Sequence, residues 1–423
     1  MTQPIIGFVG MTHLGLVSGI SATQKGFRVI CFDQDTDKVK ALNKDILAVS
    51  EPQLIELVIK NRSQISFTDV VADLKKCDVV YVAPDIATDD FGKSDLAPID
   101  AILNLTCDAA RDDAVIVVLS QVPPGFSRAR VRSGRALYYQ VETLIFGRAV
   151  ERALYPERYI IGCANPEEAL PVAYKTFLDA HDCPILKMRY ESAELAKISI
   201  NMCLVASVST ANTLAELCEK IGADWSEIVP ALKLDRRIGQ FSYLAPGLGI
   251  AGGNLERDLA TVCNFADEFG TDSGVVKSWI ANSKHRRDWP LRILHEVLLK
   301  KNAEAIVGIW GLAYKQETHS IKNSPSIALL RAICDIRVRV FDPIVPSAAA
   351  PNRICIAATS ELDACMGVDA LVIMTPWPQF SKVNPKEIIE MMKGRIVIDP
   401  FKVLDVKACR DVGLEYFTLG MVN

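Results

Sequence analysis

Short apolar runs alternate with longer segments of helical apolar spacing through the first part of the chain. Residues 4–9 predict a buried strand, a glycine turn follows, and residues 14–25 predict a helix that leads into a second strand at 27–32. Further apolar runs occupy residues 78–83, 114–119 and 158–161. Alternation of this kind predicts a parallel sheet that is covered by helices on both faces.

The pattern changes after residue 190. Residues 191–221 contain no glycine or proline and carry apolar residues at helical spacing, and Gly222 follows as a stop signal. A helix of this length is well over twice the globular average, so we expect it to bridge two domains or to form a dimer seam. Residues 223–290 predict further helices, which a glycine-rich loop at 246–253 interrupts.

A second alternating series begins near Trp289. It predicts strands at 305–310, 337–341, 370–374 and 395–399 and a helix at 324–334. We therefore predict an α/β protein with two Rossmann-like, doubly wound parallel-sheet domains, joined by a long central helix and a helical middle domain. The expected domain ranges are 1–190, 191–290 and 291–423.

Composition narrows the class of protein. The chain has 423 residues, which predicts two or three domains, and its net charge of −4 with no long basic run disfavours a nucleic-acid partner. Residues 4–10 are too short and lack the basic leader of a signal peptide, and no uninterrupted apolar run is long enough to span a bilayer. The twelve cysteines form no CxxC pair, so we expect reduced thiols, no metal site and a cytoplasmic protein without a membrane partner.

The first predicted turn has the spacing of a dinucleotide-binding motif. GxGxxG spacing is kept at 10–15, but threonine occupies the place of the middle glycine, which lets backbone approach a pyrophosphate. The helix start still offers N–H groups to an anion, and the histidine at 13 either contacts phosphate or faces solvent. The candidate cofactor-binding residues of this turn are Gly10, Thr12, His13, Leu14 and Gly15.

Asp33 strengthens the assignment of this turn. It ends the second strand, 23 residues after Gly10, where a carboxylate can bind the ribose diol, and an acid at this position favours NAD over NADP. We expect NAD as the cofactor. The alternative is a sheet domain of the same build that holds no dinucleotide, which Thr12 favours.

Motifs along the whole chain resemble the UDP-glucose/GDP-mannose dehydrogenase family. They are Asp33 with Lys38, Leu42-Asn43, Glu51-Pro52, Val122–Gly125 (VPPG), Glu142, Ala193–Asn201 (AELAKISIN), Asp235–Gly239 (DRRIG), Gly247–Asp258 (GLGIAGGNLERD), Gly311–Lys315 (GLAYK), Ser324-Pro325, Asp342-Pro343 and Thr375–Trp377. The segment 247–258 aligns without gaps on the family pattern GxGFGGSCFPKD. The resemblance implies oxidation of a sugar C6 alcohol to a carboxylate by two NAD molecules, with a cysteine that carries a thiohemiacetal and then a thioester.

The resemblance also assigns candidate catalytic residues. Lys197 and Asn201 are four residues apart, so they share one side of a helix, where an ammonium and an amide can stabilise an alkoxide or hold a water. Asp258 would orient that water or act as a base. Glu142 and Gln121 occupy family positions near the reacting centre, although Gln121 replaces a threonine.

The main departure is Asn254, which stands at the position of the catalytic cysteine. An amide cannot form a thioester, and Cys263 lies nine positions later, too far along the chain to be a good substitute. Other departures cluster around the cofactor and the sugar. Ile86-Ala87 replaces Thr-Pro, Phe126 replaces a threonine, Phe146 replaces a glutamate, Lys322 replaces an arginine, and Asp399–Lys402 replaces DGRN.

The remaining assignments also rest on the resemblance. Lys38 and Lys322 would lie near NAD, Lys315 would contact the nucleotide sugar, and Tyr243, Leu244 and Gly247 would line its site. Three outcomes stay open. The chain performs a single oxidation or a redox-neutral reaction on a nucleotide sugar, with a UDP-sugar expected; or it binds NAD or a nucleotide sugar without catalysis; or it oxidises C6 fully without a cysteine. A homodimer around the long helix is expected.

Overall fold

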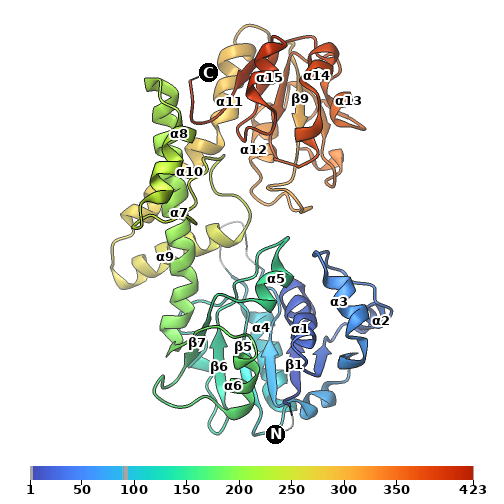
Figure 1. Cartoon of the computed structure of the whole chain (residues 1–423), viewed down its shortest axis with the longest axis vertical. Helices are drawn as coiled ribbons and strands as arrows, with labels where there is room; N and C mark the ends of the chain where they lie inside the picture. Colours follow the sequence, from blue (N-terminus) through green and yellow to red (C-terminus); the bar gives the residue numbers. More distant parts are fainter. Residues whose placement is uncertain (1–2, 88, 90–93, 423) are drawn as a thin grey trace. The chain divides into compact units, whose positions relative to one another are not determined.

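The computed structural model describes residues 3–87, 89 and 94–422. The chain forms two compact units, Met1–Ile200 and Asn201–Asn423, and the long helix α7 (Tyr190–Ile221) contributes residues to both (Figure 1). Each unit contains one sheet. The expected α/β class with two sheets and a helical central region is confirmed.

The sheet of the first unit has eight strands in the order β3-β2-β1-β4-β5-β6-β7-β8. The strands are β1 (Ile6–Val9), β2 (Val29–Phe32), β3 (Ile65–Thr68), β4 (Val79–Val82), β5 (Val115–Val118), β6 (Leu137–Gln140), β7 (Tyr159–Cys163) and β8 (Ile185–Arg189). The order reverses at β1, which pairs with both β2 and β4. Loops that leave the carboxyl ends of β1 and β4 therefore border the same crevice, where such sheets bind ligands.

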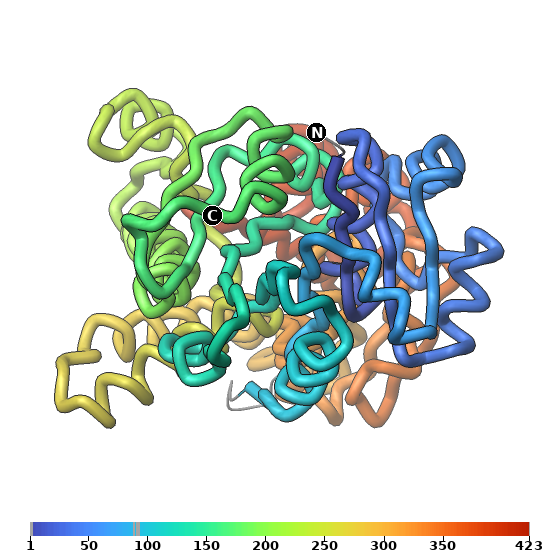
Figure 2. Tube along the Cα trace, turned by 90° about the horizontal axis from the view of Figure 1, so that it is seen from below, coloured from blue at the N-terminus to red at the C-terminus, as the bar shows by residue number. Residues whose placement is uncertain are grey.

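Helices cover both faces of this sheet. They are α1 (His13–Gln24), α2 (Thr36–Leu42), α3 (Leu54–Lys60), α4 (Ala97–Ala109), α5 (Ala149–Leu154) and α6 (Val172–Asp179). Core residues of α1, α3, α5 and α6 pack on one face, and those of α4 and the start of α7 pack on the other. In the trace of Figure 2 these elements run from blue to green.

One feature of the first sheet departs from the sequence expectation. Strand β6 pairs with β7 in antiparallel direction through Tyr139 and Gly162, whereas all other strand pairs in this sheet are parallel. The expectation of a wholly parallel sheet was therefore wrong at this junction. The predicted pattern also missed β3, β6 and β8, because their residues mix polar and apolar side chains, as in Ile185–Arg189 (ILKMR).

The sheet of the second unit has six parallel strands in the order β11-β10-β9-β12-β13-β14. They are β9 (Ile306–Trp310), β10 (Arg337–Phe341), β11 (Cys355–Ala357), β12 (Ala370–Ile373), β13 (Ile396–Ile398) and β14 (Glu415–Phe417). The helices of this unit that follow α7 are α8 (Trp225–Leu234), α9 (Asn254–Phe269), α10 (Gly274–Arg287), α11 (Trp289–Leu294), α12 (Pro325–Ala332), α13 (Glu361–Cys365), α14 (Pro385–Met391) and α15 (Val406–Asp411). Here too the order reverses at the first strand, between β9 and β12.

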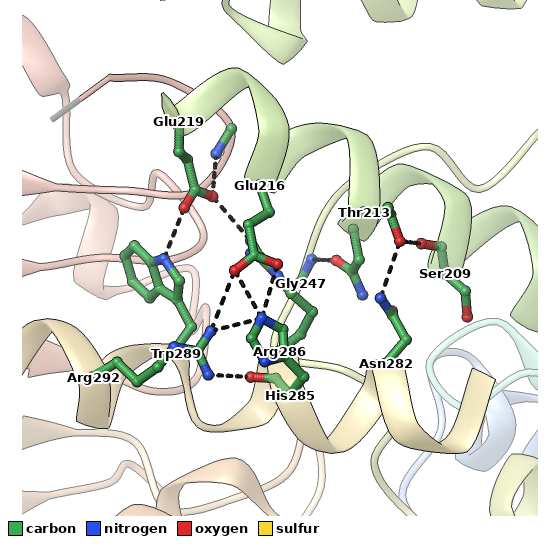
Figure 3. A network of polar contacts seen from close by, with 12 residues as sticks. Ser209, Thr213, Glu216, Glu219, Gly247, Asn282, His285, Arg286, Trp289 and Arg292 are labelled. Carbon is green, nitrogen blue, oxygen red and sulfur yellow. Dashed lines mark hydrogen bonds and ion pairs between the residues drawn. The ribbon is translucent and has the colours of Figure 1, made fainter. Parts of the chain in front are cut away.

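A buried polar network joins α7 to α10, α11 and the end of the chain (Figure 3). The Arg286 side chain is fully buried, and its Nη2 donates to Glu219 Oε1 at 3.0 Å. The same carboxylate accepts from Trp289 Nε1 and from Gly420 N–H, both at 3.0 Å. A buried cation requires such a partner, so Glu219 fixes the position of three segments at once.

Helix α7 is long and apolar enough to cross a membrane by length and composition alone. Several of its polar side chains are buried and bind other parts of the chain, as in a helix that packs within a folded protein. Glu194 accepts from Gly125 N–H and Ser127 N–H, and Asn212 accepts from Gly247 N–H. All twelve cysteines are free thiols, as the sequence predicted.

Stability is expected to fall in mild acid through His181. Burial lowers the pKa of this imidazole from 6.5 to about 4, while its Nδ1–H donates to Phe177 O at 3.1 Å. The folded state therefore disfavours the charged ring, and stability that is present above pH 6.5 is lost as the pH falls toward 4. The difference amounts to about 3 kcal/mol. Urea unfolding of the wild type and of His181→Phe at several pH values would measure it.

In that experiment His181→Phe should show a shallower loss of stability than the wild type between pH 6.5 and 4. The variant His319→Gln, at an exposed histidine, is the control and should follow the wild type. Parallel curves for wild type and His181→Phe would contradict the assignment.

Removal of the Glu219 carboxylate should destabilise the second unit strongly. Glu219→Ala removes the hydrogen-bonded carboxylate from the buried Arg286 cation, which then relies on its ion pair with Glu216 at 3.2 Å, and we expect a loss of about 3 kcal/mol in the free energy of unfolding. Glu268→Ala, at an exposed position of α9, is the matched control with an expected change near zero. Equal unfolding midpoints for the two variants would show that the ion pair contributes little.

Candidate functional site

The turn after β1 is shaped by two glycines. Gly10 has φ +93°, and a Cβ there would lie 3.0 Å from Pro84 N. A Cβ on Gly15 would lie 2.0 Å from Gly10 O, so only glycine allows α1 to start this close to the strand. These contacts explain why the first and last glycines of the motif are kept. Leu14 is buried in the core between them.

Asp33 turns its carboxylate toward this turn. Oδ2 accepts from Met11 N–H at 2.7 Å and from Lys38 Nζ at 2.9 Å, and Oδ1 accepts from Asp35 N–H at 3.0 Å. The structure thus brings Asp33, Lys38 and the glycine turn together, as a ribose-binding site requires. Lys38 neutralises the carboxylate that would receive the ribose hydroxyls.

Thr12 bonds to the end of β4 rather than standing free in the crevice. Its hydroxyl donates to Ala83 O at 3.2 Å and accepts from Asp85 N–H at 3.1 Å. The Asp85 carboxylate in turn lies against the backbone N–H of His13, at the first turn of α1. The place of the middle glycine is therefore filled by a threonine that ties two crevice loops together.

The His13 side chain is mostly covered by neighbouring side chains and does not stand free in solvent. Its Nε2 lies 2.8 Å from Glu51 Oε1, and its ring centroid lies 4.2 Å from that of Phe146. The Glu51 carboxylate also accepts from Gly147 N–H and Ala149 N–H. Glu51 therefore links the start of α1 to the start of α5.

Lys197 and Glu142 form a half-buried pair within the first unit. Lys197 Nζ donates to the Glu142 carbonyl oxygen at 2.9 Å and lies 3.8 Å from its carboxylate Oε2. Burial raises the pKa of Glu142, and the Lys197 ammonium opposes that rise. A carboxylate with a raised pKa is a stronger base than an ordinary one, which favours proton uptake at this place. Gln121 lies in the segment that follows β5.

Asn201 and Asp258 meet within the second unit. Asn201 Nδ2 donates to Asp258 Oδ2 at 2.5 Å, and Arg257 Nε lies 3.3 Å from Asp258 Oδ1. Only 1% of Asp258 is exposed. Its two oxygens are thus both engaged in the described structure, so Asp258 orients Asn201 directly and can act on substrate once one of these contacts opens.

Asn254 is the first residue of α9 and is exposed. Gly253 precedes it at the N-cap position and supplies no side chain, so the N–H groups of the first turn remain available as donors. An amide side chain at a helix start can donate to, or accept from, a hydroxyl or carbonyl group, but it cannot attack one.

The glycine-rich loop before Asn254 is fixed from three sides. Gly247 N–H donates to Asn212 Oδ1 on α7 at 2.8 Å, and Ile250 N–H donates to Ser283 Oγ on α10 at 2.7 Å. Gly252 N–H donates to the Lys322 carbonyl at 3.2 Å. Gly253 lies beside the Lys322 side chain, since a Cβ there would be 3.5 Å from its Cδ. Lys322 therefore lies at this loop.

Glu256 is a polar residue of this region that sequence reasoning missed. Burial raises the pKa of its carboxyl to about 7, although Lys322 opposes the rise, and Asn323 Nδ2 donates to its Oε2. The signal was present in the sequence, because the gap-free alignment of 247–258 places Glu256 opposite the proline of the family pattern.

The crevice of the second sheet repeats the design of the first. Gly311 has φ +95° and lies against Thr375, where a Cβ would be 2.4 Å from the threonine Cβ. Asp342 at the end of β10 accepts from Leu312 N–H at 2.7 Å and Ala313 N–H at 3.1 Å, as Asp33 accepts from the first turn. This geometry fits a second nucleotide site.

The predicted sugar-binding residues differ in exposure. Lys315 Nζ lies 5.8 Å from the ring centroid of Tyr314, next to the crevice of the second sheet. Tyr243 is half exposed, whereas Leu244 is buried and its carbonyl accepts from Trp225 Nε1 at 2.7 Å. Because Leu244 is buried, only the small exposed part of its side chain can contact a ligand. The described residues contain no group of three or more metal-ligating side chains.

Comparison with known proteins covers nearly the whole chain. Three domains of the UDP-glucose/GDP-mannose dehydrogenase family match in order: the NAD binding domain at 5–178, the central domain at 191–284 and the UDP binding domain at 308–406. UDP-glucose 6-dehydrogenase of Rickettsia conorii is 30% identical over 98% of this chain and 99% of its own length. UDP-glucose 6-dehydrogenase TuaD of Bacillus subtilis is 26% identical over 98% and 93%.

Solved structures agree on the fold. A UDP-glucose dehydrogenase from Pyrobaculum islandicum has a TM-score of 0.85 at 24% identity, covering 100% of this chain and 98% of that one. A UDP-D-ManNAc dehydrogenase from Pyrococcus horikoshii has a TM-score of 0.84 at 23% identity, covering 98% and 99%. With three family domains matched in order and a curated relative that is 30% identical over nearly its whole length, the chain belongs to the UDP-glucose/GDP-mannose dehydrogenase family, whose members are NAD-dependent enzymes that act on a CH–OH group.

Proposed function

We propose that this chain is an NAD-dependent oxidoreductase that acts on a UDP-sugar, and that its reaction stops before a carboxylate is formed. The observation that carries the proposal is the exposed amide of Asn254 at the start of α9, at the position of the family's nucleophilic cysteine. Asp258, four residues after Asn254, and its hydrogen-bonded partner Asn201 are retained in the same unit.

Loss of the thiol separates the two oxidations. The first hydride leaves an alcohol carbon and needs only a base for the hydroxyl proton. The second leaves an aldehyde-level carbon, which in this family is first captured by sulfur, and an amide cannot form that bond. The expected product is an aldehyde or keto sugar. An isomer results instead if the hydride returns from the same cofactor.

The proposed catalytic roles follow from the contacts described above. Lys197 is proposed to stabilise the alkoxide of the reacting hydroxyl by its positive charge, and the Glu142 carboxylate beside it, whose pKa burial raises, is proposed to take up the proton. Asp258 holds the Asn201 amide in place. Asn254 donates a hydrogen bond to the reacting oxygen, and Gln121 is proposed to lie near it.

Ligand binding is proposed for the two glycine turns. NAD, which supplies the hydride acceptor when bound, would be held by Gly10, Thr12, His13, Leu14 and Gly15, with Asp33 and Lys38 at the ribose. Lys322 is proposed to contact the cofactor as well. The nucleotide sugar would be bound by Lys315, Tyr243, Leu244 and Gly247. The glycine turn at Gly10 is proposed to hold a phosphate group, and the Thr12 side chain is proposed to reduce the space for that group.

A second candidate function is binding without catalysis. The hydrogen bonds of Thr12 with Ala83 and Asp85 favour this function, because they occupy groups of the phosphate turn that a dinucleotide would need in order to take part in catalysis. Full oxidation through a hydrate in place of a thioester is a further candidate, for which Glu256 and Asp258 are the carboxyl groups near Asn254 in sequence.

The ratio of NADH formed to sugar consumed separates these functions. We expect one NADH per sugar, or none with an isomerised sugar, when the protein is incubated with NAD and a panel of UDP-, GDP- and dTDP-sugars. Absorbance at the reduced nicotinamide band and quantitation of the residual sugar give the ratio. Two NADH per sugar with a uronate product would contradict the proposal, and no turnover with any sugar would favour the binding function.

We also propose a cytoplasmic homodimer with α7 in its interface. Leu214, Leu217 and Ile221 follow one another at helical spacing and are 40%, 51% and 64% exposed. A row of exposed leucine and isoleucine side chains on a long helix is a surface that a second copy can cover. The twelve free cysteines fit a reducing compartment.

The double variant Leu214→Glu/Leu217→Glu should be monomeric, because four carboxylates would be buried in the proposed seam. Multi-angle light scattering would report about half of the wild-type mass. Leu186→Glu, at a leucine of 45% exposure on β8, is the control and should keep the wild-type mass. A monomeric wild type, or a double variant of unchanged mass, would exclude this seam.

A further inference from the structure

The start of α1 already holds an anion in this structure. A helix start attracts anions because its first N–H groups have no helical partner, and dinucleotide-binding sheets use this end of the helix for the pyrophosphate. Here Asp85 is bonded through its N–H to Thr12, and its carboxylate lies against the backbone N–H of His13, the first residue of α1. Asp85 comes three residues after β4, which lies next to β1 at the reversal of strand order.

Thr12 holds Asp85 at this place. The threonine hydroxyl accepts from Asp85 N–H at 3.1 Å and donates to Ala83 O at 3.2 Å, so the backbone on either side of Pro84 is tied to the turn. Gly10 packs against the same proline, with Pro84 N only 3.0 Å from the position of a Cβ. The backbone that carries the Asp85 carboxylate is thus fixed beside the turn.

The charges that face Asp85 come from three neighbouring elements. His13 lies on α1 and is itself bound to the Glu51 carboxylate. Glu142, which follows β6, interacts unfavourably with Asp85, and Lys197 on α7 is the cation paired with Glu142. The packed protein around the Asp85 carboxyl raises its pKa. Three carboxyl groups therefore share this crevice with one ammonium and one imidazole.

We propose that Asp85 sets the affinity of this turn for phosphate-bearing ligands, by competing with the dinucleotide pyrophosphate for the start of α1. The inference rests on the proposed use of NAD. Two anions cannot share the same N–H groups, so Asp85 must withdraw before the pyrophosphate binds, and its charge then remains close to the phosphates. The wild-type turn binds an uncharged nucleoside without this cost.

The test compares ligands with and without phosphate on the full-length protein. Isothermal calorimetry at low salt would measure adenosine, ADP-ribose and NAD binding to the wild type, Asp85→Asn and Asp113→Asn. The asparagine keeps the size of Asp85 and an acceptor for His13 N–H but removes the charge. Asp113→Asn makes the same charge change at the amino end of β5, beside Arg111 and away from the turn.

We expect Asp85→Asn to bind ADP-ribose and NAD about tenfold more tightly or better than the wild type, with adenosine affinity unchanged. Asp113→Asn should match the wild type for all three ligands. A gain of affinity is not expected from a merely damaged fold, and Asp85→Ser should reproduce it with a smaller side chain.

The wild type, but not Asp85→Asn, should also gain affinity for ADP-ribose as the pH falls and the carboxyl is protonated.

Two results would overturn the inference while leaving the proposed function intact: equal NAD affinity of wild type and Asp85→Asn together with normal turnover, or an equal gain for adenosine and ADP-ribose. Failure of every variant to bind NAD and ADP-ribose would contradict both the inference and the proposed function. Tighter NAD binding to Asp85→Asn without turnover of any sugar would support the inference and count against the catalytic proposal.

Discussion

The buried polar side chains of α7 are the constraint on which this structure depends. A 32-residue helix with glutamates and asparagines in its buried positions is stable only when each of them finds a partner. Glu194 caps the segment 125–127, Asn201 binds Asp258, Asn212 fixes Gly247, and Glu219 joins Arg286, Trp289 and Gly420. The positions of the glycine-rich loop and of α9 follow from these bonds.

This arrangement separates the side chains that hold the fold from those of the proposed reacting centre. Replacement of Glu219 or Asn212 would leave buried donors without acceptors, which lowers the stability of the whole unit. Asn254 is exposed at a helix start and is not one of these buried partners, so a different residue at this position would change the chemistry of the site without the same loss of stability. The changes that matter for the reaction lie at positions that the fold does not need.

Much of the fold follows from local patterns in the sequence. Residues 191–221, without glycine or proline, predicted α7 to within one residue at its start, and the apolar runs at 305–310 and 337–341 predicted β9 and β10. The turn at 10–15 was recognisable because Gly10 and Gly15 are required by backbone contacts that any such turn must make. Strand β6 was missed, and its antiparallel pairing with β7 is a property of the sheet that no short segment encodes.

The candidate site was predictable only where one element carries the signal. Lys197 and Asn201 lie on one helix and Asp33 ends one strand, so spacing alone indicated them. The contact of Asp85 with His13, the bond between His13 and Glu51, and the contact of Glu256 with Asn323 each join residues 38 to 72 positions apart, and only the folded chain brings them together. Burial then gives Glu256 a pKa of about 7, which its sequence neighbours do not predict.

Mass analysis of the product formed by Asn254→Cys, beside that of the wild type, tests the central claim most directly. With NAD and the accepted UDP-sugar, the wild type should give an aldehyde, a keto sugar or an isomer, because no thiol captures the intermediate. The cysteine variant should give a uronate, two hydrogens poorer and one oxygen richer than the alcohol. A uronate from the wild type would contradict the account.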